Sequence, residues 1–73
     1  MRIKVKVRFN TQKGSIENVG KCQYILYLPF ADGPDSPKNV AKILSKNLGI
    51  RLEEIHFVEV DGNGYWNFDL ERQ

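Results

Sequence analysis

The first stretch of the chain alternates strictly between basic and apolar side chains. The apolar positions are Ile3, Val5, Val7 and Phe9, and the basic positions between them are Arg2, Lys4, Lys6 and Arg8. A period of two in β-branched residues predicts a β-strand over residues 2–9. The same alternation predicts a sheet with one buried face and one face in solvent.

The next two segments differ in polarity. Residues 10–21 are polar and contain Gly14 and Gly20, which predicts a loop, with at most a short extended piece around Ile16. From Cys22 to Leu28 both parities are apolar. This pattern predicts a second strand that is central, or partly covered on both faces.

A single helix is predicted over residues 37–48. Ser36 supplies a hydroxyl N-cap, and Pro37 has its φ angle already set for the first helical turn. Apolar residues follow at helical spacing, and Gly49 ends the helix. The predicted inner face consists of Val40, Ile43, Leu44 and Leu48, and the outer face carries Lys38, Lys42 and Lys46.

The last part of the chain predicts a β-hairpin. Residues 55–60 and 65–70 read as strands, and Asp61–Gly64 between them is rich in residues that favour tight turns. The predicted order is therefore β-β-α-β-β in one domain over residues 1–73. With one helix to cover one face, we expect a two-layer α+β fold in which the helix packs on a four-stranded mixed or antiparallel sheet.

Two stretches resemble the YggU-like family of uncharacterised small α+β proteins. Residues 4–16 resemble the family pattern V-x-V-x-P-x-A-x-x-x-S-I, and Leu28–Gly33 resembles A-P-P-x-D-G ahead of a helix that ends in Leu-Gly. The resemblance covers residues 3–60 in order and spacing. Phe9 stands where the family often has Pro, and Asp61–Trp66 replaces its basic G-x-x-S-R-x-K run. The resemblance therefore implies a fold more than an activity.

The net charge and the reactive residue types of the chain limit which classes of function we expect. The net charge of +2 is too small by itself to indicate nucleic-acid or membrane binding. Cys22 and His56 are single residues of their kind, without a catalytic or metal-ligand spacing around them. We expect no enzyme, no metal and no cofactor. The N-terminus has no signal-peptide pattern, and the longest apolar stretch, Tyr24–Phe30, is too short to span a bilayer, so we expect a cytoplasmic protein.

The basic ladder of the first strand is the leading candidate site. Alternate strand residues lie about 6.5–7 Å apart, close to the phosphate spacing of an extended nucleic-acid strand. The ladder is Arg2, Lys4, Lys6 and Arg8, extended by Lys13 and Lys21. RNA bases would stack on Tyr27, Tyr65 or Trp66 if these share the face. The competing interpretation is an ordinary solvated face whose cations pair with acidic residues on neighbouring strands.

The alternative function is a protein-interaction module or a homodimer. One helix leaves much aromatic and apolar surface to cover, and exposed surface of this kind marks protein interfaces. The candidate contact residues are Ile25, Tyr27, Tyr65 and Trp66. The partner and the oligomeric state stay open at this stage.

Overall fold

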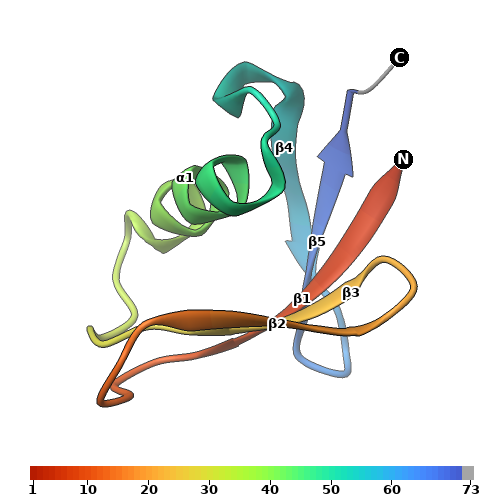
Figure 1. Ribbon diagram of the computed structural model, residues 1–73. Helices are drawn as coiled ribbons and strands as arrows, with labels where there is room; N and C mark the ends of the chain where they lie inside the picture. The colour runs from red at the N-terminus through yellow and green to blue at the C-terminus, as the bar shows by residue number, and fades with distance from the viewer. Residues whose placement is uncertain (72–73) are drawn as a thin grey trace.

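The computed structural model describes residues 1–71 and contains one α-helix and a five-stranded sheet (Figure 1). In chain order the elements are β1 (Arg2–Arg8), β2 (Ser15–Gly20), β3 (Gln23–Tyr27), α1 (Ser36–Leu48), the short 3₁₀ helix η1 (Leu52–Glu54), β4 (Ile55–Val60) and β5 (Tyr65–Leu70). The α+β class, the single helix and the C-terminal hairpin are confirmed. The four-stranded sheet and the order β-β-α-β-β are wrong, because a strand lies between the first two predicted strands.

The missed strand is β2, in the segment predicted as a loop. It pairs antiparallel with β3 only, with Ile16 opposite Leu26, and most of its side chains are exposed. An edge strand with one inward apolar residue has a weak alternation signal. The turn after β2 also has a weak sequence signal, because its residue with a positive φ, 59°, is Cys22 and not a glycine.

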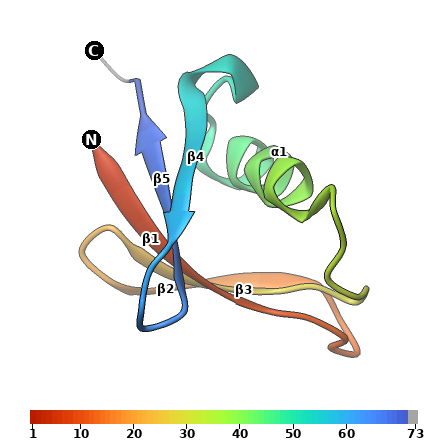
Figure 2. The ribbon, with the colours of Figure 1, turned by 180° about the vertical axis from the view of Figure 1, so that it is seen from behind.

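β1 is the centre of the sheet, whose strand order is β2-β3-β1-β5-β4. It pairs parallel with β3 and antiparallel with β5, and β4 pairs antiparallel with β5. β1, β3 and β4 therefore run one way, while β2 and β5 run the other way. The sheet twists strongly, so that the β4–β5 hairpin stands nearly across the β2–β3 hairpin (Figures 1 and 2).

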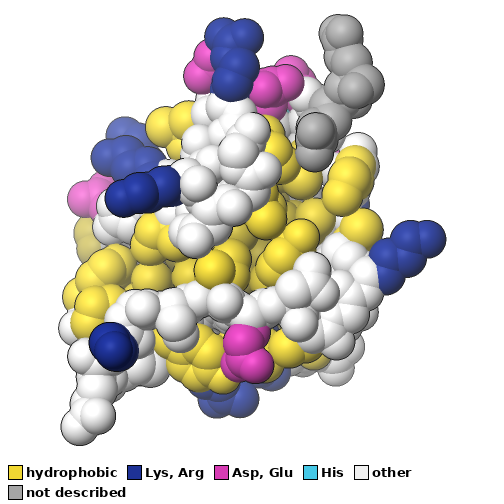
Figure 3. Space-filling view, viewed as in Figure 1, with side chains coloured by type: hydrophobic (Ala, Val, Ile, Leu, Met, Phe, Trp, Pro, Cys, Tyr) yellow, Lys and Arg dark blue, Asp and Glu magenta, His cyan; other side chains and the backbone are white. Residues whose placement is uncertain are grey.

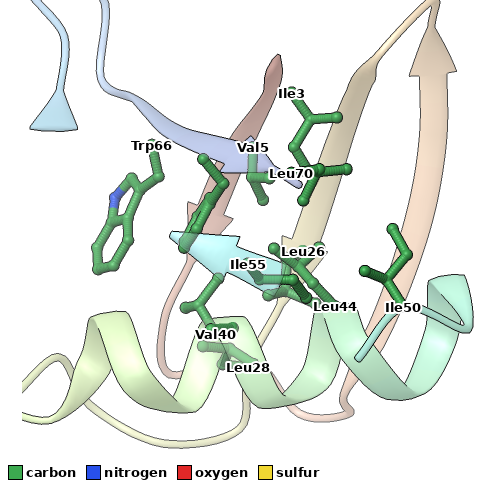
Figure 4. Packing of buried hydrophobic residues seen from close by; sticks show 12 residues of the cluster. Ile3, Val5, Leu26, Leu28, Val40, Leu44, Ile50, Ile55, Trp66 and Leu70 are labelled. Atoms are coloured by element: carbon green, nitrogen blue, oxygen red, sulfur yellow. The ribbon is translucent and has the colours of Figure 1, made fainter. Parts of the chain in front are cut away.

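α1 lies on one face of the sheet and closes the core between the two hairpins (Figure 2). The side chains with less than 2 % exposure come from β1, β3 and β5 or their ends and from the helix (Figure 4). They are Phe68, Ile3, Leu26, Leu28, Leu44, Val5 and Val40. The Phe57 ring lies 5.5 Å from the Phe68 ring and 5.6 Å from the Trp66 ring, which extends the apolar contact to the edge strand β4.

The two ends of α1 are built differently from each other. Gly49 has a left-handed φ of 68° and its N–H donates to the Ser45 carbonyl, which confirms it as the residue that ends the helix. Ser36 is not the N-cap, since Asp35 occupies that position without a side-chain capping bond. The buried Ser36 hydroxyl instead accepts the N–H of Gly33 at 2.8 Å and holds the preceding turn. No helix within residues 1–71 is long and apolar enough to cross a bilayer.

Phe68→Ala should lower the free energy of unfolding by about 3–5 kcal/mol, because it opens a cavity where a ring is fully buried. Val60→Ala is the matched control: Val60 also lies on the hairpin but is 48 % exposed, so its loss should cost about 0.5 kcal/mol or less. Urea unfolding followed by Trp66 fluorescence measures both. A loss below about 1 kcal/mol for Phe68→Ala would contradict this description of the core.

Candidate functional site

The basic ladder of β1 emerges on the sheet face opposite α1, here called the open face. Arg2, Lys4 and Arg8 are exposed and Lys6 is half-buried. Because β1 is central, Lys4 and Lys6 have neighbours on both sides, Gln23 and Ile25 from β3 and Asn67 and Tyr65 from β5. Arg2 pairs in the register only with Asp69 of β5, and Arg8 only with Tyr27 of β3. Within residues 1–71 no helix covers this face (Figures 1 and 2).

Two of the four cations are paired with acidic residues. Arg2 Nε lies 3.7 Å from Asp69 Oδ1, and Lys4 Nζ lies 3.9 Å from Asp61 Oδ2. Exposed pairs at these distances stabilise a fold by only about 0–1 kcal/mol, but they reduce the positive potential that a polyanion would meet. Glu17 and Glu59 reach the same face from the two edge strands, by their register with Ile25 and Asn67.

The cations at the other end of the ladder lack a carboxylate partner among the described residues. Lys6 Nζ donates to the Asn63 carbonyl at 3.2 Å and lies 5.1 Å from the centroid of the Tyr65 ring. Arg8 lies beside Tyr27 in the register. This end therefore combines two cations with the half-buried Tyr27 and Tyr65, which lie on the open face as the stacking prediction requires.

Tyr27 is held by a polar contact with β2. Its hydroxyl donates to Glu17 Oε1 at 3.1 Å. The hydrogen bond to the Glu17 carboxylate raises the pKa of Tyr27 above its ordinary value of 10.0, because losing the proton would lose this bond. The contact also turns the Glu17 side chain onto the open face.

The other predicted site residues lie elsewhere. Lys13 is in the loop that joins the Arg8 end of β1 to β2, whereas Lys21 is in the β2–β3 turn beside the start of β1. These two lysines are therefore near opposite ends of β1. Trp66 is buried on the α1 side of the sheet, where its ring lies 6.0 Å from the Phe9 ring, so it is not placed to stack with a ligand on the open face.

A second surface, absent from the sequence-based prediction, lies between α1 and β2. It is a groove of about 340 Å³ whose lining includes Ile16, Leu26, Leu28, Phe30, Ile43 and Lys46. Figure 3 shows apolar side chains across the hollow between the helix and the strand. The groove arises because α1 meets the β4 side of the sheet through its contacts and leaves the β2 side partly uncovered. Lys46 is the one charged residue in the lining.

A third feature is the apolar surface of β4, the other edge strand. Phe57, Val58 and Val60 are 40 %, 42 % and 48 % exposed, although Phe57 touches the core rings. Neighbouring exposed apolar residues on an edge strand are a site for pairing with another chain. The sequence of this segment, Ile-His-Phe-Val-Glu-Val, does not by itself indicate an edge position, which follows from the strand order.

The polar groups of the described residues form no recognisable reaction centre. No group of three or more potential metal ligands occurs in residues 1–71. His56 Nε2 lies 2.9 Å from Glu71 Oε1 at the exposed edge of the sheet. Cys22 is half-buried in the β2–β3 turn.

Asp61 organises the turn that places Tyr65 beside Lys6. Its Oδ1 accepts the N–H groups of Asn63 and Tyr65 at 2.9 and 3.0 Å, and its Oδ2 accepts Asn67 Nδ2 at 3.3 Å. The Tyr65 N–H makes the largest contribution to lowering the pKa of Asp61 below its ordinary value of 3.8, followed by smaller contributions from Asn67, Asn63 and Lys4. The ionised Asp61 carboxylate therefore stabilises the folded state at pH values above the ordinary pKa of an aspartate.

Asp61→Asn should make the free energy of unfolding depend less on pH in the acidic range. A depressed folded pKa contributes stability that is present above the unfolded value and is lost as the pH falls through the folded value. The variant should therefore be less stable than the wild type at pH 7, and the difference should shrink toward pH 2.5. Urea midpoints at several pH values measure it, with Asp32→Asn, in the exposed turn before α1, as control. A difference that does not change with pH would show that Asp61 is not the titrating group.

Comparison with known proteins gives no relative from which a role could be transferred. No protein-family profile, no curated protein and no solved structure matches this chain. The resemblance to the YggU-like family stays a prediction from the sequence. The function is therefore inferred from the surfaces of this chain alone.

Proposed function

We infer that this protein is a non-catalytic binding domain, and that it holds a segment of a protein chain in the groove between α1 and β2. The observation that carries this inference is the apolar lining of the groove, which is continuous with the buried core at Leu26 and Leu28. Concave apolar surfaces with few polar groups are the usual form of a binding site. A cytoplasmic location stays a prediction from the sequence.

The groove favours an extended peptide over a small polar ligand. One wall is the edge strand β2, which pairs with β3 and has no second strand partner within residues 1–71. An edge strand offers backbone N–H and C=O groups to an added strand, and alternate side chains of that strand would enter the groove. Phe30, 40 % exposed, stands at the border where an apolar side chain would contact it.

A second candidate function is the binding of single-stranded RNA or another polyanion on the open face. Lys6 and Arg8 with Tyr27 and Tyr65 support it, since cations beside aromatic rings on an uncovered sheet are how proteins hold unpaired bases. The ion pairs of Arg2 and Lys4 count against a long binding track. The groove is therefore the better supported site.

Selection of peptides from a random display library tests the groove. The wild-type domain should enrich peptides with alternating apolar residues, and Ile43→Glu should abolish their binding, because it places a carboxylate in the apolar lining. Lys38→Glu, on the outer side of α1, should bind as the wild type does. Failure to enrich any peptide, or peptides that bind Ile43→Glu equally well, would exclude the groove as a peptide site.

Fluorescence anisotropy with labelled oligouridylate at low salt tests the second candidate. Arg8→Glu should weaken binding about tenfold or more, since the mutation reverses the charge of a cation that has no carboxylate partner within residues 1–71. Arg2→Glu should have a smaller effect, because Asp69 already offsets that charge. Equal effects of the two variants, or the absence of binding by the wild type, would exclude the open face as an RNA-binding site.

A further inference from the structure

We propose that the segment held in the groove is the edge strand β4 of a second copy of this chain, so that the molecules associate head to tail. This proposal rests on the proposed function and names its partner. The two surfaces are at opposite edges of one sheet, since the strand order is β2-β3-β1-β5-β4. Each molecule therefore carries one groove and one exposed apolar strand.

Both edges present apolar side chains, and both do so on the α1 side of the sheet. Phe57 and Val60 lie opposite Phe68 and Trp66 in the register, so they are on the α1 side of the sheet. The groove is on the same side, above Ile16 and beside Ile43. If β4 of one molecule continues the sheet of the next at β2, Phe57 and Val60 approach the groove and lose their contact with water. Removing the exposed parts of these apolar side chains from water favours the contact.

The directions of the strands allow this continuation without turning a molecule over. β4 runs parallel to β1, because both are antiparallel to β5. β2 runs against β1, because it is antiparallel to β3, and β3 is parallel to β1. A second copy that is rotated to follow the twist of the sheet, but not turned over, therefore brings β4 antiparallel to β2, with both helices on one side of the joined sheet. Antiparallel pairs are the slightly more stable arrangement.

The charges of the two edges are also complementary. The β4 edge and the η1 turn before it carry more acidic than basic residues, with Glu53, Glu54, Glu59 and Asp61 against Arg51. The groove end of β2 carries more basic residues, with Lys13 and Lys46 against Glu17. Unlike edges attract and like edges repel, which favours head-to-tail contact over a symmetric pairing of two grooves or two β4 strands.

The contact is heterologous, so it produces open chains or closed rings and not a two-fold dimer. A β-bulge interrupts β4 between Phe57 and Glu59, and β2 has a register shift between Asn18 and Gly20. These irregularities shorten the ladder that two molecules form. We therefore expect weak association that increases with protein concentration.

Analytical ultracentrifugation of two variants, alone and mixed, tests the proposal. Ile43→Glu blocks the groove and leaves β4 intact, while Val60→Lys blocks β4 and leaves the groove intact. Each variant alone should be a monomer, and the equimolar mixture should form a heterodimer that grows no further. The wild type should form a series of larger species as its concentration rises.

Two substitutions of exposed lysines provide a test that does not depend on changes to apolar residues, which could prevent folding. Lys46→Glu should weaken self-association about tenfold by removing the cation of the groove. Lys38→Glu makes the same change of charge two turns earlier on α1 and should have little effect.

Three results would overturn the proposal: a wild type that stays monomeric at about 1 mM, a mixture that forms no heterodimer, or a two-fold dimer that both variants retain. A monomeric wild type that still selects peptides in the groove would overturn this proposal and leave the proposed function standing. The absence of both self-association and peptide binding would remove the two together.

Discussion

The coverage of one sheet by one helix is the constraint that shapes this molecule. A helix with its side chains is about 10 Å wide, whereas five strands spaced about 4.8 Å apart span roughly 20 Å. α1 therefore shields about half of one face and none of the other. The sheet adapts by twisting, so that the two hairpins fold toward the helix (Figure 1). Phe68 and Leu44 are fully buried in the core that results. The groove beside β2 is the part of the apolar face that this twist does not close.

Within residues 1–71 the open face has no helix over it, and its side chains interact mainly through charge. Its strands bring basic residues from β1 next to acidic residues from β5 and from the turn after β4, so the charges are shared between segments far apart in the sequence. This arrangement keeps an uncovered face in water without a large net potential. The face differs near Lys6 and Arg8, where Tyr65 and Tyr27 lie beside the cations and no carboxylate of the described residues pairs with them.

The sequence predicts the elements whose signal is local. The alternation of residues 2–9, the helical spacing after Pro37 and the turn at Asp61–Gly64 each correspond to an observed element. β2 was missed because a strand at an edge needs only Ile16 to face inward. The groove and the exposed β4 depend on strand order, which pairs β1 with segments distant in sequence. The pattern of residues 55–60 predicts a strand, but it does not indicate whether another strand lies beside that segment.

The place of β1 at the centre of the sheet also determines how the chain reaches its fold. Its two neighbours are β3, about twenty residues away, and β5, about sixty residues away, and the Leu70 N–H donates to the Met1 carbonyl. Contacts between such distant segments require the closure of long loops before they gain any energy, so folding should be slow for a domain of this size. During synthesis, Ile3 and Val5 leave the ribosome long before Phe68 and Trp66 can cover them. The nascent chain therefore carries its first strand uncovered until the last strand is made, and this interval is when it is most exposed to aggregation.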